Sequence, residues 1–166
     1  VAYLKKHNFP FSLHGRTENC GDNPYFDFDK YTDGKLCAEA FANRDRKTML
    51  IIAPPLDQSY AQHIISGAEF VAKKTGLSVQ VLDGATSDSP SAQVTEALAA
   101  HLKTNPDTDC VLTASAPSAF AANIAIEEQG RRIGSDIDLS SKEALSFLKA
   151  IRKEILFYYE DVGANG

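Results

Sequence analysis

The sequence predicts an α/β fold in which helices cover both faces of a parallel sheet, a doubly wound arrangement. Four apolar, β-branched stretches begin at Thr48, Ser78, Asp109 and Ile137, so their starts lie 30, 31 and 28 residues apart. This spacing has room for a strand, a turn, a helix of about a dozen residues and a return to the sheet. Helical patterns fill the intervals. Strands that alternate with helices in this way are typical of βαβ units and therefore of parallel strands.

The expected elements follow one another through the middle of the chain. We expect strands over 48–53, 78–82, 109–113 and 137–139. We expect helices over 32–43, between Asp57 and Gly76, from Ser89 or Pro90 onward, and from Ser115 or Ala116 to Gly130. Apolar residues recur at helical spacing in each helix, and we expect them to face the core. Tyr60, Ile65 and Phe120 belong to these inward stripes.

The two ends of the chain differ from the middle. A short helix is expected over 1–7, and short strands over 11–13 and 25–28. The segment 17–24 is polar and rich in turn-forming residues, so we expect a subdomain boundary there. Near the other end, a short helix is expected over 145–151 and a last strand over 155–159.

Composition and charge exclude several classes of protein. The chain has 166 residues, 43% of them hydrophobic, and a chain near 150 residues buries about 68–70% of its unfolded surface. It therefore needs no disulfide or structural metal to fold. The net charge is −5 and no run of Lys and Arg exceeds two residues, so the chain itself is not expected to bind nucleic acid.

The cysteines and the apolar runs indicate the compartment. Cys20, Cys37 and Cys110 form no C-x-x-C motif and have no histidine at metal-ligand spacing, which favours a reducing compartment. No stretch approaches the roughly 18 apolar residues of a membrane span, and the first residues lack the order of a signal peptide. We expect a cytoplasmic location, no membrane partner, no metal and no cofactor. Because the chain begins with Val1, we also expect it to be an excerpt of a longer protein.

Candidate binding residues follow directly after the expected strands. In open parallel sheets, ligands bind beyond the carboxyl ends of the strands, where loops and helix N-termini present backbone donors. The residues at these positions are the loop 54–57 with Asp57, then Asp83 and Gly84, Ser115, Lys142 and Glu143, and Glu160 and Asp161. As a set, they predict a rim that hydrogen-bonds a hydroxylated small molecule.

Each of these residues also has a purely structural interpretation. Ser115 can be only a helix cap, Asp57 and Asp83 only turn formers, and Glu143 only a solvated carboxylate. His63 lies in the first turns of its expected helix, near the loop that holds Asp57. It can contact a ligand there, and a histidine at the surface or at the edge of the core fits equally well.

The common signatures of enzymes are missing from the sequence. It contains no G-x-S-x-G, no G-x-G-x-x-G after a strand, no G-x-x-x-x-G-K-[ST] and no H-E-x-x-H. Glu160 and Asp161 are adjacent on an expected strand, so their side chains should point apart and cannot share a substrate. We therefore predict no catalytic residue and no enzymatic activity.

Five segments carry a further pattern through their order and spacing. They are PFSLHGRT, YFDFDKYTDGKLCAEAF, TMLIIAPPLDQSYAQHIISGAEFVAKKTGL, VLTASAPSAFAANIAIEEQG and IGSDIDLSSKE. In this order they resemble the effector-binding domain of the LacI/GalR (lactose/galactose/purine repressor) family of bacterial transcription regulators. Gly15-Arg16, Asp29-Lys30 and the run 64–68 stand where that family has G-R, D-N and R-x-x-G-F. The similarity spans nearly the whole chain.

The resemblance adds to the set of candidate ligand-binding residues. Ser115 stands at the Asn of the family's N-D pair, and Glu143 at the Asp of its G-[FY]-D pattern, so both are implied to bind the ligand. Ile64 replaces the Arg of R-x-x-G-F, and His63 or the backbone is expected to contact the ligand hydroxyls instead. Asp161 is proposed by proximity. The predicted ligand-binding set is His63, Ser115, Glu143, Asp161, Asp57 and Asp83.

The resemblance also implies a domain organisation and a set of partners. The fold would be periplasmic-binding-protein-like, with two α/β subdomains around a ligand cleft and a separate helix-turn-helix headpiece. Residues 1–16 would be the last helix and strand of the N-terminal effector subdomain, 17–161 the C-terminal effector-binding subdomain, and 162–166 the start of the return. The implied partners are a small-molecule, sugar-like effector, operator DNA through the headpiece outside this chain, and a second copy in a homodimer.

Two other functions stay open. A periplasmic sugar-binding protein of an uptake system shares this architecture, but it would carry a signal peptide and no headpiece. A flavodoxin-like α/β enzyme would need a phosphate-cradling turn after the first strand of the sheet, where Ala53-Pro54-Pro55 offers few N–H donors.

Overall fold

A computed structural model describes residues 1–15, 21–142, 150 and 152–157 of the chain. They fall into two compact units, one with residues 1–29 and one that begins at Lys30. The expected boundary between residues 16 and 17 stays a prediction.

The first unit is small. It contains α1 (Ala2–Lys6), β1 (Leu13–His14) and β2 (Tyr25–Phe26), and the two strands pair in parallel with Leu13 opposite Tyr25. The strand expected over 11–13 lies mostly later, because its backbone bonds run from Leu13 N–H to the Pro24 carbonyl and from Gly15 N–H to the Phe26 carbonyl.

The second unit is built on a five-stranded sheet. Its strands are β3 (Thr48–Ile52), β4 (Ser78–Val81), β5 (Cys110–Thr113), β6 (Asp138–Ser141) and β7 (Leu156–Phe157). They lie in the order β4-β3-β5-β6-β7, and every neighbouring pair is parallel. The expected parallel sheet is therefore confirmed. The ends of β3, β4, β5 and β6 differ from the expected strand ends by at most two residues.

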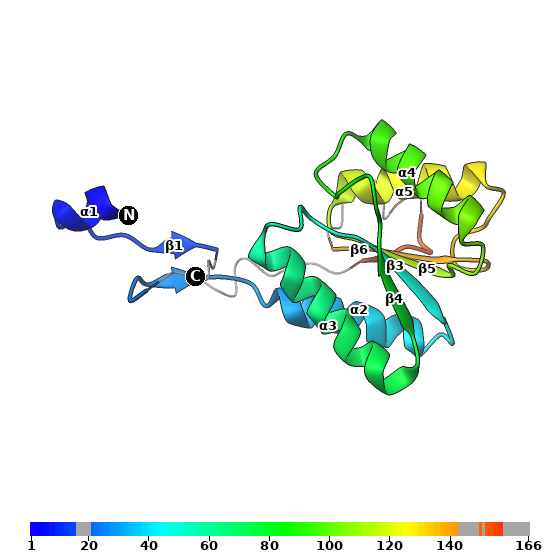
Figure 1. The fold of residues 1–166 in the computed structure, drawn as a ribbon, viewed down its shortest axis with the longest axis horizontal. Helices are drawn as coiled ribbons and strands as arrows, with labels where there is room; N and C mark the ends of the chain where they lie inside the picture. The colour runs from blue at the N-terminus through cyan, green and yellow to red at the C-terminus, as the bar shows by residue number, and fades with distance from the viewer. Residues whose placement is uncertain (16–20, 143–149, 151, 158–166) are drawn as a thin grey trace. The chain divides into compact units, whose positions relative to one another are not determined.

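Helices cover both faces of this sheet (Figure 1). They are α2 (Lys30–Ala42), α3 (Ser59–Thr75), α4 (Ser91–Thr104) and α5 (Ala116–Glu128), with α2 and α3 on one face and α4 and α5 on the other. The doubly wound fold class is thus confirmed. The helix expected over 145–151 lies outside the described residues apart from Ala150, and residues 158 and 159 of the last expected strand lie outside them as well.

Alternation along the strands produces two hydrophobic cores. Leu50 and Ile52 of β3 pack with α4 and α5, whereas Met49 and Ile51 pack with α2 and α3. All four side chains are fully buried. Successive side chains of a strand point to opposite faces, so one apolar strand supplies both cores.

Two side chains expected to face the core do not enter it, because Tyr60 is only half-buried and Phe120 is 41% exposed. Ile65 is also half-buried, but it packs against the core beneath α2 and α3 as expected. On α5 the buried side is built largely from alanines and Ile126, whose packing leaves Phe120 on the outer side.

Two glycines set how closely α2 and α3 pack. A Cβ on Gly34 would lie 2.0 Å from the Ile64 carbonyl oxygen, and a Cβ on Gly67 would lie 2.0 Å from the Tyr31 carbonyl oxygen. Only glycine permits this approach of the two backbones. The crossing holds the N-terminal halves of both helices at the carboxyl edge of the sheet.

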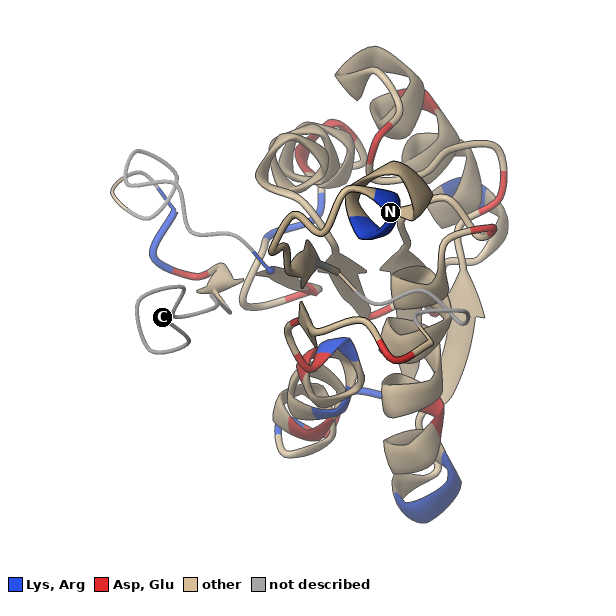
Figure 2. Ribbon diagram, turned by 90° about the vertical axis from the view of Figure 1, so that its left-hand side faces the viewer, with Lys and Arg blue, Asp and Glu red and all other residues tan. Residues whose placement is uncertain are grey.

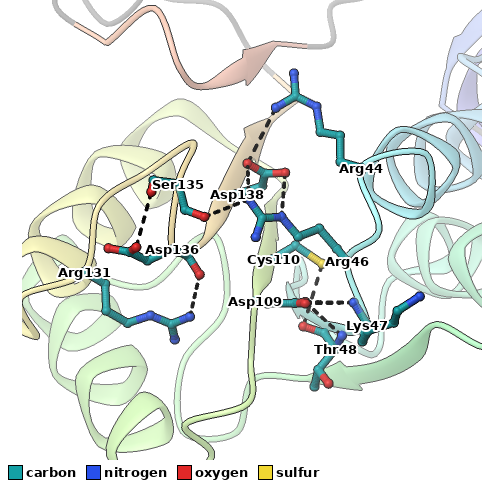
Figure 3. Close-up of polar contacts among 10 residues, drawn as sticks. All are labelled: Arg44, Arg46, Lys47, Thr48, Asp109, Cys110, Arg131, Ser135, Asp136 and Asp138. Atoms are coloured by element: carbon teal, nitrogen blue, oxygen red, sulfur yellow. Dashed lines mark hydrogen bonds and ion pairs between the residues drawn. The ribbon is translucent and has the colours of Figure 1, made fainter.

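A polar network ties the opposite, amino edge together (Figure 3). The Arg46 guanidinium donates to both carboxylate oxygens of Asp138, at 2.9 and 3.1 Å, and to the Ser135 carbonyl at 3.2 Å. The Asp109 carboxylate accepts from the backbone N–H groups of Lys47 and Thr48. These contacts connect segments about 60 to 90 residues apart. They hold the starts of β3, β5 and β6 in register.

Candidate functional site

The carboxyl edge of the five-stranded sheet gathers the candidate residues that the structure describes. Asp57 follows β3, Asp83 follows β4, and Ser115 follows β5. Because each strand leads into a helix, the N-termini of α3, α4 and α5 lie at this same edge. Glu143 and Asp161, the other two acids of the predicted set, lie outside the described residues. His63 is half-buried in the second turn of α3.

The loop after β3 forms one side of the edge. Asp57 is exposed, and Gln58 caps α3 without a hydrogen bond from its side chain. The Gln62 side-chain amide donates to the Leu56 carbonyl at 3.0 Å and so holds the loop against the first turn of α3.

The loop after β4 is rich in hydroxyl and carboxylate groups. One Asp83 oxygen accepts the Gly84 N–H at 2.9 Å, and Gly84 has a φ of +80°, which favours glycine. The Gln93 side-chain amide donates to the Gly84 carbonyl at 2.8 Å, and the Thr86 N–H donates to the Ser89 hydroxyl at 3.0 Å. These bonds fix the loop, while the second Asp83 oxygen has no partner among the described residues.

Ser115 caps α5 and also joins two loops. It forms a capping box with Ser118, in which each side chain accepts from the other's backbone N–H. The Ser115 hydroxyl donates to the Ser87 carbonyl at 2.9 Å. These contacts make Ser115 a residue that positions the loop after β4. A direct contact between Ser115 and a ligand stays a prediction.

A cavity of about 280 Å³ opens at the ends of β3 and β4. Pro54, Leu56 and Leu82 contribute apolar surface to it, and its polar groups come from four residues. These are Asp83, Thr86, Ser89 and Gln93. An apolar wall with a few fixed polar groups is the usual form of a small-molecule site.

Further polar groups lie along the same edge. Asp33 and Lys142 line a small cavity together with Ile64, Leu112 and Ala114. Tyr60, one turn before Ile64, has its pKa raised, first by burial and then by the charge of Asp88, with Lys142 acting in the opposite direction. Tyr60 is therefore close to both charges.

The remaining chemistry is structural. Burial raises the pKa of the Cys37 thiol to about 12 and also raises that of Cys110, so neither is a reactive nucleophile. No group of three or more His, Cys, Asp or Glu residues that could hold a metal occurs in the described part of the chain. No helix there is long and apolar enough to cross a membrane.

A larger cavity, of about 500 Å³, lies near the amino edge and is lined by Arg131, Arg152 and Glu127 among others.

Several residues of the edge lie outside the set predicted from the sequence. They include Thr86, Ser89 and Gln93, although the hydroxyl-rich run 83–91 directly after a strand is a signal that could identify them. Tyr60 was expected in the core. Its aromatic ring fits an apolar stripe, and only the position of α3 shows that it sits at the end of that stripe.

Comparison with known proteins gives a family match over most of the chain. Residues 13–159 match the family described as periplasmic binding proteins and sugar binding domain of the LacI family. No curated protein matches the sequence.

Three solved structures show the breadth of the structural similarity. A regulatory protein of the LacI family from Chloroflexus aggregans has 18% sequence identity and a TM-score of 0.79, covering 93% of this chain and 56% of its own. A substrate-binding protein of a sugar ABC transport system from Bordetella parapertussis 12822 has 16% identity and a TM-score of 0.78, covering 93% and 48%. A LacI family transcriptional regulator from Arthrobacter sp. FB24, in complex with lactose, has 15% identity and a TM-score of 0.77, covering 96% and 58%. The chain thus spans about half the length of these structures.

Proposed function

The chain belongs to the family of periplasmic binding proteins and sugar-binding domains of the LacI family, and we propose that it is the effector-binding part of a bacterial transcription regulator. The observation that carries this proposal is the cavity at the carboxyl edge, with its apolar wall and its rim of carboxylate, amide and hydroxyl groups. The proteins it resembles bind or regulate, so we propose binding without catalysis.

A carbohydrate is the proposed effector. Carboxylate and amide oxygens accept hydrogen bonds from sugar hydroxyls, and the serine and threonine hydroxyls can donate or accept. The Arthrobacter regulator, which has this fold, was solved with lactose. We propose that His63, Asp57, Asp83, Glu143 and Asp161 contact the effector.

The remaining partners and the location follow from the regulator proposal. Operator DNA would be bound by a headpiece outside this chain, in the cytoplasm. In the ribbon of Figure 2, both basic and acidic residues occur along the helices of the second unit. Effector binding would favour one orientation of two effector subdomains and thereby change the affinity for DNA. In this proposal residues 1–16 belong to the N-terminal subdomain, 17–161 to the C-terminal one, and 162–166 to the return.

Effector titration of the complete protein tests this proposal. We expect a sugar to bind in calorimetry, and Glu143→Gln to weaken that binding by about 1.5–3 kcal/mol, the range for a hydrogen bond to a charged group. Glu69→Gln, on the exposed side of α3, is the matched control and should leave affinity and melting temperature unchanged. Equal affinities for wild type and Glu143→Gln would remove Glu143 from the site.

A periplasmic sugar-binding protein is the second candidate function. The similarity to the Bordetella substrate-binding protein is nearly as high as that to the Chloroflexus regulator. The two functions differ in what precedes residue 1 and in their response to DNA. A regulator should retain a specific DNA fragment in a mobility shift, and a sugar should change that retention. A secretion signal and no DNA retention would establish the uptake function instead.

The outer side of α5 supports the proposed homodimer. Pro117 and Phe120 are exposed and Ile124 is half-buried, which leaves an apolar stripe on a helix that is apolar on its other sides as well. A helix that is hydrophobic all round is usually buried. A second copy of the chain is the partner we propose for this stripe.

Phe120→Glu should therefore weaken the dimer at least tenfold, because it places a charge in an apolar interface. Sedimentation equilibrium of the complete protein measures this effect. Phe70→Glu, at a phenylalanine of similar exposure on α3, is the control and should leave the oligomeric state unchanged. A dimer that survives Phe120→Glu would place its interface elsewhere.

A further inference from the structure

We propose that the carboxyl edge selects its ligand by charge: it takes an uncharged or amino-bearing sugar and excludes the phosphorylated counterpart, and Asp83 sets this preference. The inference rests on the proposed function, since it concerns the same site. It concerns the charge of the ligand, which membership of the family leaves open.

The charge of the 280 Å³ cavity is the first observation. None of the described residues that line it is Lys, Arg or His, and among these residues Asp83 is the one ionisable group. Asp83 is exposed, and one of its oxygens accepts the Gly84 N–H while the other faces no described partner. A phosphate in this cavity would meet a like charge and no described cation. An ammonium group or a hydroxyl would meet an acceptor.

Helix N-termini could oppose this preference, because their free N–H groups attract anions. Two carboxylates lie close in sequence to these N-termini. Asp57 directly precedes the N-cap of α3, and Asp88 lies two residues before the N-cap of α4, although neither helix has an acidic residue in its first turn. The N-terminus of α5 is closed by the Ser115 and Ser118 capping box. We expect these groups to reduce the attraction of the helix N-termini for a ligand anion.

The lysines nearest this edge do not outweigh its negative charges. Lys142 shares its small cavity with Asp33, and Lys30 is only 7% exposed at the start of α2. Burial is the main cause that raises the pKa of the Tyr60 hydroxyl, and the charges of Asp88, Lys142 and Asp57 act on it less, with Lys142 opposing the two acids. The negative character of the described edge comes from its acids, Asp33, Asp57, Asp83 and Asp88, against Lys30 and Lys142.

Two matched sugar series test the proposal on the complete protein. The first is D-glucose, D-glucosamine and D-glucose 6-phosphate, and the second is the corresponding galactose set, each titrated by calorimetry at low salt. We expect the phosphate to bind at least tenfold more weakly than the parent sugar, and the amino sugar to bind at least as tightly. Added salt should reduce the discrimination, because Asp83 is exposed and its charge is screened.

Asp83→Asn isolates the residue without disturbing the loop. The asparagine oxygen can still accept the Gly84 N–H, so the turn should persist, and the ratio between phosphate and parent affinities should shrink at least threefold. Asp107→Asn removes the same charge from an exposed loop before β5, at the opposite edge, and should leave the ratio unchanged. Phosphates that bind within threefold of their parents, or an unchanged ratio in Asp83→Asn, would overturn the inference while the proposed function stands. Failure of every sugar to bind would contradict the proposed function itself, and this inference with it.

Discussion

Gly67→Ala is expected to lower the free energy of unfolding by about 3 kcal/mol, the upper part of the usual range for overpacking. The new Cβ would lie 2.0 Å from the Tyr31 carbonyl oxygen, which belongs to the backbone of α2 and cannot rotate away. The two helices would have to separate, and the core beneath them would lose contacts. In an isolated helix the same change would be favourable by about 1 kcal/mol. The sign of the effect therefore distinguishes the packed crossing from simple helix propensity.

Denaturant unfolding of wild type and variant measures this effect. Ser66→Ala is the matched control, since Ser66 is the preceding residue of α3 and is exposed, and it should change stability by less than about 0.5 kcal/mol. A Gly67→Ala protein as stable as wild type would show that α2 and α3 do not cross as closely as described.

Arg46→Leu is expected to destabilise the protein by about 3 kcal/mol, because it removes the two hydrogen bonds and the nearer of two guanidinium partners from a buried carboxylate. Asp138 is 1% exposed and receives two hydrogen bonds from Arg46. The same contact raises the pKa of Arg46, so its guanidinium stays charged. The variant also loses the bond to the Ser135 carbonyl, which holds the loop before β6.

Arg44 provides the control for this prediction. Its guanidinium lies 3.5 Å from Asp138 but its side chain is 47% exposed, so Arg44→Ala should cost less than about 1 kcal/mol. Adding Asp138→Asn to Arg46→Leu should restore part of the lost stability, because it removes the buried charge that has lost its hydrogen bonds to Arg46. If Arg44→Ala and Arg46→Leu were equally mild in thermal unfolding, the buried pair would not stabilise the amino edge.

Local patterns in the sequence were enough to predict the class of fold. The apolar strands repeat at an interval that only a crossover helix fits, so the parallel sheet followed from spacing alone. The ends of helices were also predictable from nearby residues. Gly76 adopts a φ of +76° as the C-cap of α3, and Pro117 lies in the first turn of α5, after its N-cap. The carboxyl edge as the place of the site followed from strand direction. These features depend on residues close together in the chain.

The orientation and the partners of side chains were decided by tertiary structure. Periodicity placed Phe120 in the core, but the alanines of α5 pack against the sheet and leave the phenylalanine outside. Arg46 and Asp138 lie 92 residues apart, and nothing in their local sequence marks them as a pair.

The roles of the site residues likewise depend partly on the sequence and partly on the tertiary structure. The sequence determined that Asp83 and Ser115 follow strands. Only the arrangement of the loops in the folded protein shows that Asp83 lines a cavity. The same arrangement shows that the Ser115 hydroxyl donates a hydrogen bond to the Ser87 carbonyl, 28 residues away in the chain. A hydroxyl can cap a helix, bind a ligand or join two loops, and the sequence permits all three. The choice depends on which acceptor the folded chain brings within about 3 Å, and that is a property of the packed helices and loops.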